Sequence, residues 1–178
     1  PAALLPPERN AKILDVGANL KEAAGAEIID AGGLALMPGL IDMRVVTGEP
    51  GGEHKETLKS AGRAAAAGGV TTMVVMPDTD PVIDDTSLVG FILRRAPTQT
   101  KVRVLPAAAL TRGLDGEIMT EMGLLQEVGA VRGSKGARSG AEALVMRWAL
   151  SYSTAFGALI VHRCAKPALA RGGAMNEG

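Results

Sequence analysis

The chain has 178 residues, of which 47% are apolar, and its formal net charge is zero. A chain of this length can bury the core of one domain, and the neutral charge balance excludes the attraction that would favour nucleic acid or an anionic membrane as a partner. Because no uninterrupted apolar run reaches about 18 residues, we expect no membrane span, and the first residues predict no signal peptide. The single cysteine excludes an internal disulfide framework and is compatible with a cytoplasmic protein.

Aromatic and histidine residues are scarce. Aromatic side chains make up 2% of the chain, so the core must be built from Leu, Val, Ile, Ala and Met. The two histidines are His54 and His162. A hydrolytic metal centre usually needs several imidazoles, so this count matters for any hydrolytic function.

The predicted elements change in character along the chain. Residues 12–17 and 27–32 each predict a short strand that is closed by a glycine turn. An apolar segment at 34–43 follows, broken by Met-Pro-Gly. Helices are then predicted at 57–67, after an Asp84 or Asp85 cap, at 118–128 and at 141–152. Strands are predicted at 70–76, 102–105, 130–131 and 159–161.

This alternation of strands and helices predicts an α/β fold with a parallel sheet wrapped by helices. The order permits a doubly wound sheet or a (β/α)8 barrel. No Gly-x-Gly-x-x-Gly fingerprint follows the first strand and no P-loop occurs, which favours a TIM-type barrel. A complete barrel needs roughly 250 residues, so we expect only about the first five β/α units here and an open edge.

The segment 37–51 reads Met-Pro-Gly-Leu-Ile-Asp-Met-Arg-Val-Val-Thr-Gly-Glu-Pro-Gly. It resembles the first barrel strand of dihydroorotases and related cyclic amidohydrolases, which carry Pro-Gly-(Leu/Phe)-Ile-Asp-x-His-x-His-x-Arg-x-Pro-Gly at this place. Further matching blocks follow in the family's order at 53–57, 64–72, 76–81 and 173–178. The resemblance implies an amidohydrolase barrel at 37–178, preceded at 1–36 by part of an N-terminal β-sandwich.

The resemblance also implies a chemistry. Dihydroorotases close the ring between carbamoyl aspartate and dihydroorotate in pyrimidine biosynthesis, usually with zinc. The two histidines of the family pattern lie on one face of the strand and can share a metal, and the arginine two residues later can clamp the substrate carboxylate. The metal activates water and polarises the cyclic amide carbonyl.

This chain departs from the pattern at each of those positions. Arg44 and Val46 stand where the family has the two histidines, and Gly48 stands where it has the arginine. Valine has no donor atom, and Arg44 stays protonated and repels a cation. Asp78 replaces the asparagine that usually follows Met-Pro, and its charge would repel a substrate carboxylate.

Two later family positions have changed as well. Lys135 occupies the place of an aspartate that can contact the metal, and a lysine serves as a ligand only when it is carbamylated and other ligands are near. Arg163 occupies the place of a histidine, while His162 lies one residue earlier and faces the other way on a strand. The resemblance therefore implies no intact catalytic residue and no cofactor in this chain, although the family uses zinc.

The remaining polar residues have simpler interpretations. We expect His54 to be solvated, Lys135 to lie in a solvated loop, and the aspartates of residues 78–85 to form turns and a helix cap rather than a cation site. His162 and Cys164 share a face but are too few ligands for zinc. They are expected to be ordinary residues at a strand end.

Two functions remain open. The chain resembles non-catalytic dihydroorotase homologues that serve as structural partners of aspartate carbamoyltransferase, and such a role implies an oligomer. The alternative is an active dihydroorotase whose metal ligands come from the missing barrel strands or from a partner chain. A third reading is an incomplete or altered version of an ordinary enzyme.

Overall fold

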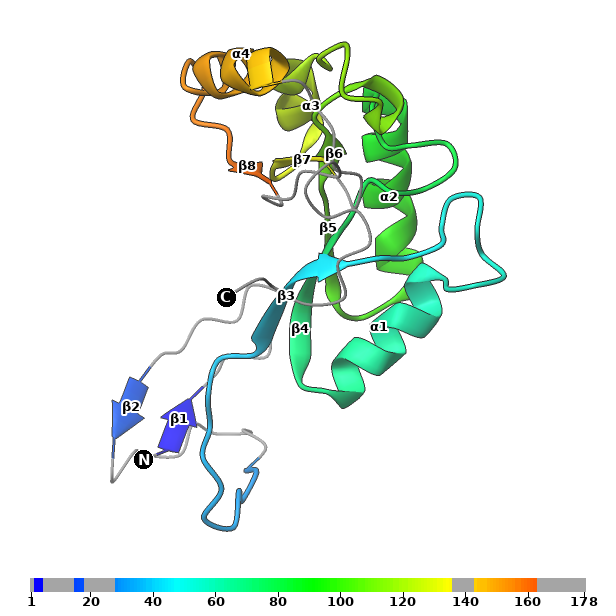
Figure 1. Cartoon of the computed structure of the whole chain (residues 1–178). Coiled ribbons are helices and arrows are strands. Elements are labelled where there is room, and N and C mark those ends of the chain that lie inside the picture. The colour runs from blue at the N-terminus through cyan, green and yellow to red at the C-terminus, as the bar shows by residue number, and fades with distance from the viewer. Residues whose placement is uncertain (1, 5–14, 18–27, 136–142, 163–178) are drawn as a thin grey trace, which may run out of the picture. The chain divides into compact units, whose positions relative to one another are not determined.

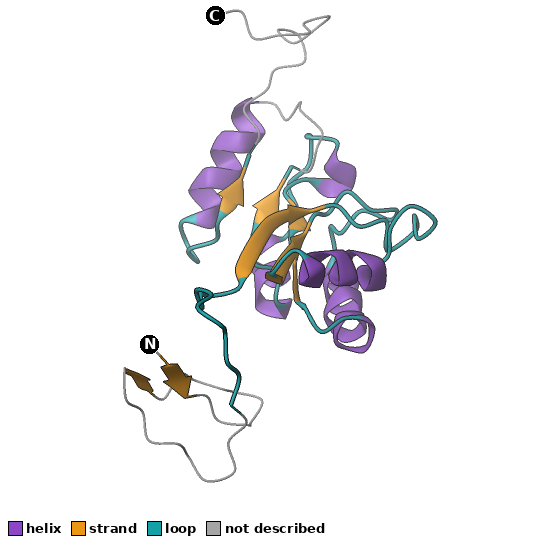
Figure 2. Cartoon of the chain, turned by 90° about the horizontal axis from the view of Figure 1, so that it is seen from below, coloured by secondary structure: helices purple, strands orange, loops and turns teal. Residues whose placement is uncertain are grey.

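The computed structural model describes residues 2–4, 15–17, 28–135 and 143–162. The chain divides into two compact units, Pro1–Met37 and Pro38–Gly178. Figure 1 shows the elements in chain order, and Figure 2 separates helices, strands and loops by colour.

In the first unit, β1 (Ala2–Leu4) and β2 (Asp15–Gly17) form an antiparallel pair. The predicted strand at 27–32 is wrong for its described part, because residues 28–32 form no strand. The carboxylate of Asp30 accepts the backbone N–H of Gly32 at 2.8 Å. Such a local hydrogen bond competes with sheet pairing. The assignment of residues 1–36 to a β-sandwich stays a prediction.

The described residues of the second unit form two three-stranded parallel sheets. The first has the order β3 (Leu40–Val45), β4 (Val70–Val75), β5 (Arg103–Pro106), and the second the order β6 (Ala108–Ala109), β7 (Gly133–Ser134), β8 (Ile160–Val161). A single residue, Ala107, separates β5 from β6, so the two are halves of one strand. Its backbone N–H donates to the carbonyl of Val75 at 2.8 Å.

The sheets therefore join into a run of parallel strands in which β5 pairs with β4, and β6, the continuation of β5, pairs with β7. The helices of this unit are α1 (Leu58–Ala67), α2 (Thr86–Gln99), the 3-10 helix η1 (Arg112–Leu114), α3 (Met122–Val128) and α4 (Ala143–Ser153). Figure 1 shows α1 and α2 beside β4 and β5. Strand, helix and parallel strand follow one another as expected for part of a barrel.

Two helix starts agree with the sequence prediction. Thr57 caps α1 through a capping box: its hydroxyl accepts the N–H of Ser60 at 3.0 Å, and the Ser60 hydroxyl accepts the N–H of Thr57 at 3.0 Å. Asp85 caps α2 by accepting the N–H groups of Ser87 at 2.7 Å and Leu88 at 3.1 Å.

The third helix was predicted to begin too early. Residue 118 was expected to start it, but α3 begins at Met122. The carbonyl of Ile118 accepts the backbone N–H of Arg112 at 2.9 Å, and Thr111 forms a β-bridge with Met119. This pairing holds the backbone extended and delays the helix.

The short strand predicted at 130–131 is also misplaced, because the strand is β7 at Gly133–Ser134. Gly129 ends α3 with φ 118°, a left-handed conformation that suits glycine. The N–H of Ala130 still donates to the carbonyl of Leu125 at 2.9 Å. The helix end thus uses residues that an apolar pattern alone assigns to the strand.

The main core lies between the strands and α1 and α2, and its members are aliphatic or methionine side chains. Its buried residues include Leu58, Met73, Val75, Ile83, Val89, Ile92, Val104 and Leu125. A smaller cluster of buried residues contains Leu110, Met122 and Ala149. Within the described residues, no helix is long and apolar enough to cross a membrane.

Candidate functional site

The carboxyl ends of the parallel strands are the place where a (β/α) barrel carries its reactive groups. In this chain they are formed by the residues that end or follow β3, β4, β7 and β8. Each end places a different kind of side chain at this face, and together they decide which chemistry the site allows.

At β3, both positions that the family pattern gives to histidine are exposed. Arg44 is solvent-exposed, and Val46 exposes 54% of its surface. The carboxylate of Asp42 accepts the backbone N–H of Arg44 at 2.8 Å. This end of β3 offers a guanidinium and an alkyl group, and neither can bind a divalent metal.

The loop after β3 closes tightly around Gly48. Its N–H donates to the carbonyl of Glu56 at 3.0 Å, and its carbonyl accepts the N–H of Gly52 at 2.5 Å. A Cβ at this position would collide with the carbonyl of Gly52 and lie 2.8 Å from that of Glu56. The position of the family arginine therefore holds no side chain and has no room for one.

Glu49 is a structural residue of this loop that the sequence reasoning missed. Its side chain is 2% exposed, one carboxylate oxygen accepts the N–H of Leu58 at 2.9 Å, and the other pairs with Arg95 of α2. A buried carboxylate at the start of α1 is stabilised by the helix dipole. Glu49 thus ties the loop to both helices, but the family pattern leaves its position unspecified.

Arg132, just before β7, is a second residue that the sequence reasoning missed. Its side chain is 5% exposed, and one terminal nitrogen donates to the carbonyl of Met43 and to the sulfur of Met76, the latter at 3.1 Å. The Arg132 side chain thus extends from the residue before β7 to β3 and to Met76 just after β4. Burial lowers the pKa of Arg132, and the charge of Arg44 lowers it further.

Lys135 follows β7 and is 7% exposed, so the expectation of a solvated loop lysine is wrong. The backbone of β7 pairs with β8 at Ser134 and Val161, and Lys135 and His162 each follow a paired residue. Burial lowers the pKa of the Lys135 ammonium. Partial burial lowers the pKa of His162, and the charge of Lys135 lowers it further.

Residues 163–178 lie outside the described part of the chain. Arg163 and Cys164 fall there, so the interpretation of the His162–Cys164 pair stays a prediction. His162 itself is exposed. His54 is exposed as expected, in a turn before α1.

The aspartates after β4 serve local structure, as the sequence predicted for the helix cap. Asp84 accepts the N–H of Gly113 at 2.8 Å, and Asp85 caps α2. The Ser87 hydroxyl donates to Asp85 and lowers its pKa. Asp78, at the position of the family asparagine, is half-buried, and its part in substrate binding stays a prediction.

The described residues do not fit a zinc site. They contain no group of three His, Cys, Asp or Glu side chains close enough to share a metal ion. Zinc needs three or four such ligands. The residues at the end of β3 and on either side of β7 are instead Arg44, Val46, Arg132 and Lys135, three of which are cations.

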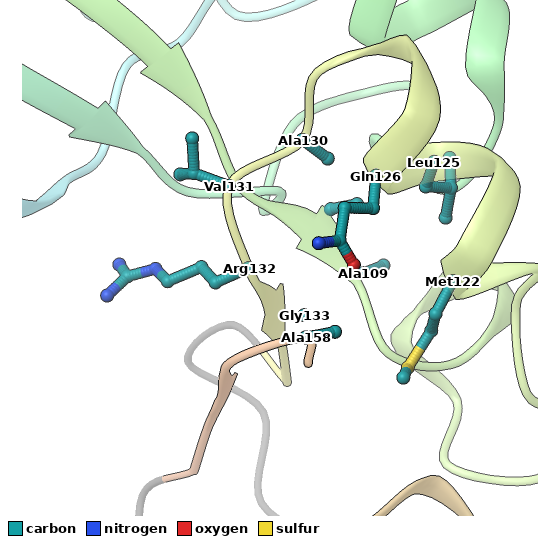
Figure 3. Close-up of a pocket in the computed structure, with 10 residues that line it drawn as sticks. Ala109, Met122, Leu125, Gln126, Ala130, Val131, Arg132, Gly133 and Ala158 are labelled. Carbon is teal, nitrogen blue, oxygen red and sulfur yellow. The ribbon is translucent and has the colours of Figure 1, made fainter. Parts of the chain in front are cut away.

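Two cavities are lined by described residues of this unit. One, of about 10 Å³, lies between α3 and the strands and is lined by residues such as Met122, Leu125 and Ala130. It has room for roughly one water molecule, and Figure 3 shows Arg132 extending away from it. The other, of about 370 Å³, is lined by the starts of α2 and α3 and by Arg112.

Comparisons with known proteins agree with this architecture. Residues 33–178 match the family model described as dihydro-orotase-like. Dihydroorotase from Geotalea daltonii is 42% identical over 167 residues, covering 94% of this chain and 39% of that protein. Dihydroorotase from Geobacter metallireducens is 38% identical over 169 residues, covering 95% of this chain and 40% of that protein. The chain thus spans about two fifths of the length of these relatives.

Among solved structures, L-hydantoinase (dihydropyrimidinase) from Arthrobacter aurescens superimposes with a TM-score of 0.73 at 22% identity. The match covers 85% of this chain and 35% of that protein, and at this identity it shows the fold alone. The described strands and helices are those of part of such an α/β fold. With the family model matching residues 33–178, the chain belongs to the dihydroorotase-like family of the amidohydrolases.

Proposed function

We propose that this chain is part of a dihydroorotase homologue of pyrimidine biosynthesis that has lost metal-dependent hydrolysis and acts as a structural partner of aspartate carbamoyltransferase. One observation carries the proposal: the guanidinium of Arg44, the alkyl group of Val46 and the ammonium of Lys135 stand at positions where the family pattern has metal ligands. The curated relatives are named dihydroorotases, and their activity belongs to those proteins.

Loss of the metal follows from the charges at the site. Hydrolysis of a cyclic amide by this family needs a metal that activates water and polarises the carbonyl. Arg44 and Lys135 repel a divalent cation, and Val46 offers it no electrons. Arg132 adds a further positive charge, which is buried in contact with Met43 of β3 and with Met76 after β4. A cation brought there loses hydration and gains no ligands among these residues.

Loss of substrate recognition has a separate cause. Bidentate binding of a substrate carboxylate requires a guanidinium group that faces it at hydrogen-bond distance. The closed loop at Gly48 leaves no space for an arginine side chain. Asp78 places a carboxylate where the family pattern has the neutral amide of an asparagine. Metal binding and carboxylate recognition therefore fail at different residues, so a single reversion would not restore activity.

The alternative is an active dihydroorotase whose ligands come from outside the described residues. It is favoured by the 42% identity with the Geotalea daltonii enzyme. Under this alternative the ligands of β3 have become dispensable, and residues elsewhere supply a complete set.

Elemental analysis and a turnover assay on the intact purified protein separate the two. We expect zinc well below one equivalent and no hydrolysis of dihydroorotate. Zinc at one equivalent or more, with turnover that a chelator abolishes, would establish the active enzyme instead.

The partnership is tested by sedimentation velocity with purified aspartate carbamoyltransferase. A joint boundary that is heavier than either protein alone is expected. Independent sedimentation of the two proteins at all mixing ratios would remove the structural role and leave a homologue without an assigned partner.

A further inference from the structure

Buried positive charge flanks β7, with Arg132 just before the strand and Lys135 just after it. Arg132 and Lys135 expose 5% and 7% of their surfaces, whereas side chains of these types are almost never fully buried unless they are paired. Among the described residues, neither side chain has a carboxylate as a hydrogen-bond or ion-pair partner. The contrast is Arg95, which is 44% exposed and still has Glu49 as its partner.

The partners of Arg132 leave its charge uncompensated. Its terminal nitrogen donates to a backbone carbonyl of Met43 and to the thioether of Met76, which is a weak acceptor. Its Nε is buried and, within the described part of the chain, has no acceptor. A guanidinium that has left water for neutral partners and one empty donor is unfavourable.

A second guanidinium belongs to the residue next in sequence to a partner of the first, because the carbonyl of Met43 that accepts from Arg132 directly precedes Arg44. Repulsion from Arg44 lowers the pKa of Arg132, in addition to the larger effect of burial. Asp42 accepts the backbone N–H of Arg44, but no ion pair between described residues joins its carboxylate to either guanidinium. An anion between two such groups would relieve the repulsion and accept their free N–H groups at once.

The neighbouring strand ends have the same sign of charge. Lys135 lies at the end of β7, and its ammonium acts on His162 at the end of β8. His162 is exposed. Positive charges that lie near one another raise the local concentration of anions.

We propose that Arg44, near the carboxyl end of β3, and Arg132, just before β7, hold a small oxyanion next to the positions where the family pattern places a metal. The ligand class is a carboxylate or a phosphate group, because both present paired oxygens to a planar guanidinium. This inference rests on the proposed function, because both require that no metal occupies these positions. It adds that an oxyanion binds there in place of the metal.

The test is isothermal titration of the intact protein with inorganic phosphate and, separately, with acetate, at constant ionic strength set by chloride. Saturable binding of one equivalent is expected for at least one of them. The anion that saturates the site shows whether the ligand class is a phosphate or a carboxylate. Arg44→Met removes a charge-assisted contact and should weaken binding by about tenfold or more. Arg44 is exposed, so this variant should fold.

Arg63→Met is the matched control, because Arg63 is an exposed arginine on α1. Its titration should equal that of the unchanged protein. Arg132→Met should abolish binding, with circular dichroism as the check on its folding. Lack of saturation with both anions, or equal weakening in Arg44→Met and Arg63→Met, overturns the site.

A zinc titration of the same sample distinguishes this failure from failure of the proposed function. Absence of both anion and zinc binding refutes the oxyanion site and leaves the loss of metal standing. Stoichiometric zinc binding without anion binding refutes both.

Discussion

Replacing Gly48 by alanine tests the closed loop that replaces the substrate clamp. The added Cβ meets two backbone carbonyls, those of Gly52 and Glu56, and neither can rotate away as a side chain would. Overpacking of this kind costs about 1–3 kcal/mol. Relief requires the loop to open, which weakens the two hydrogen bonds of Gly48, each worth about 0.5–1.5 kcal/mol.

Against this loss, alanine restricts the unfolded chain and returns about 0.4–1 kcal/mol. We therefore expect Gly48→Ala to lower the free energy of unfolding by about 2–3 kcal/mol. In a domain of this size that corresponds to a fall in Tm of roughly 4–12 °C. The assay is urea unfolding followed by circular dichroism, with a thermal melt as a second measurement.

Gly68→Ala is the matched control. Gly68 has φ −87°, and a Cβ there would meet its nearest neighbours at 3.6 Å, an ordinary contact. This change should be neutral or slightly stabilising. If Gly48→Ala unfolds at the same urea concentration as Gly68→Ala, the loop is open enough to accept a side chain and the steric argument fails. In that case restoring arginine at Gly48 becomes a reasonable route to carboxylate binding.

Three further changes test the neighbouring interactions. Glu49→Ala should lower the free energy of unfolding in urea by about 2–3 kcal/mol, because it removes two hydrogen bonds to a buried carboxylate. Arg95→Met should lower it by less, because the Arg95 side chain is 44% exposed. Equal losses in the two variants would contradict this. Asp85→Ala should cost about 1 kcal/mol through loss of the α2 cap, and an unchanged unfolding midpoint would speak against the cap. The pKa of His162 lies below 6.5 in the folded protein. The unfolded state therefore binds more protons, and the free energy of unfolding falls as the pH drops below 6.5. Lys135→Met should raise the pKa of His162 in an NMR titration, and a lower value would refute the electrostatic coupling.

Arg132 illustrates a limit of sequence reasoning at the site. A lone arginine beside a short apolar run is normally a solvated residue, and nothing in its spacing marks it as buried. Burial comes from β3 and the end of β4, which lie 89 and 56 positions away in the chain at the two contact atoms. Lys135 was misjudged for the same reason, since exposure depends on which strands pack around a loop.

Gly48 shows a related limit. The sequence identifies a glycine at the position of the family arginine, and this establishes that the side chain is missing. Whether a side chain could return depends on the carbonyls of Gly52 and Glu56. Their approach is a property of the folded loop.

Local chemistry and the family pattern by themselves determine much of this protein. The alternation of apolar strands and helices, a cap at Asp84 or Asp85, the family and the residue types at positions 44 and 46 all follow from short stretches of sequence, because propensity, capping and side-chain identity are local properties. Tertiary structure alone decided the start of α3, the position of β7 and the burial of Arg132 and Lys135. These depend on hydrogen bonds and packing between segments that are distant in the chain, which no local pattern encodes.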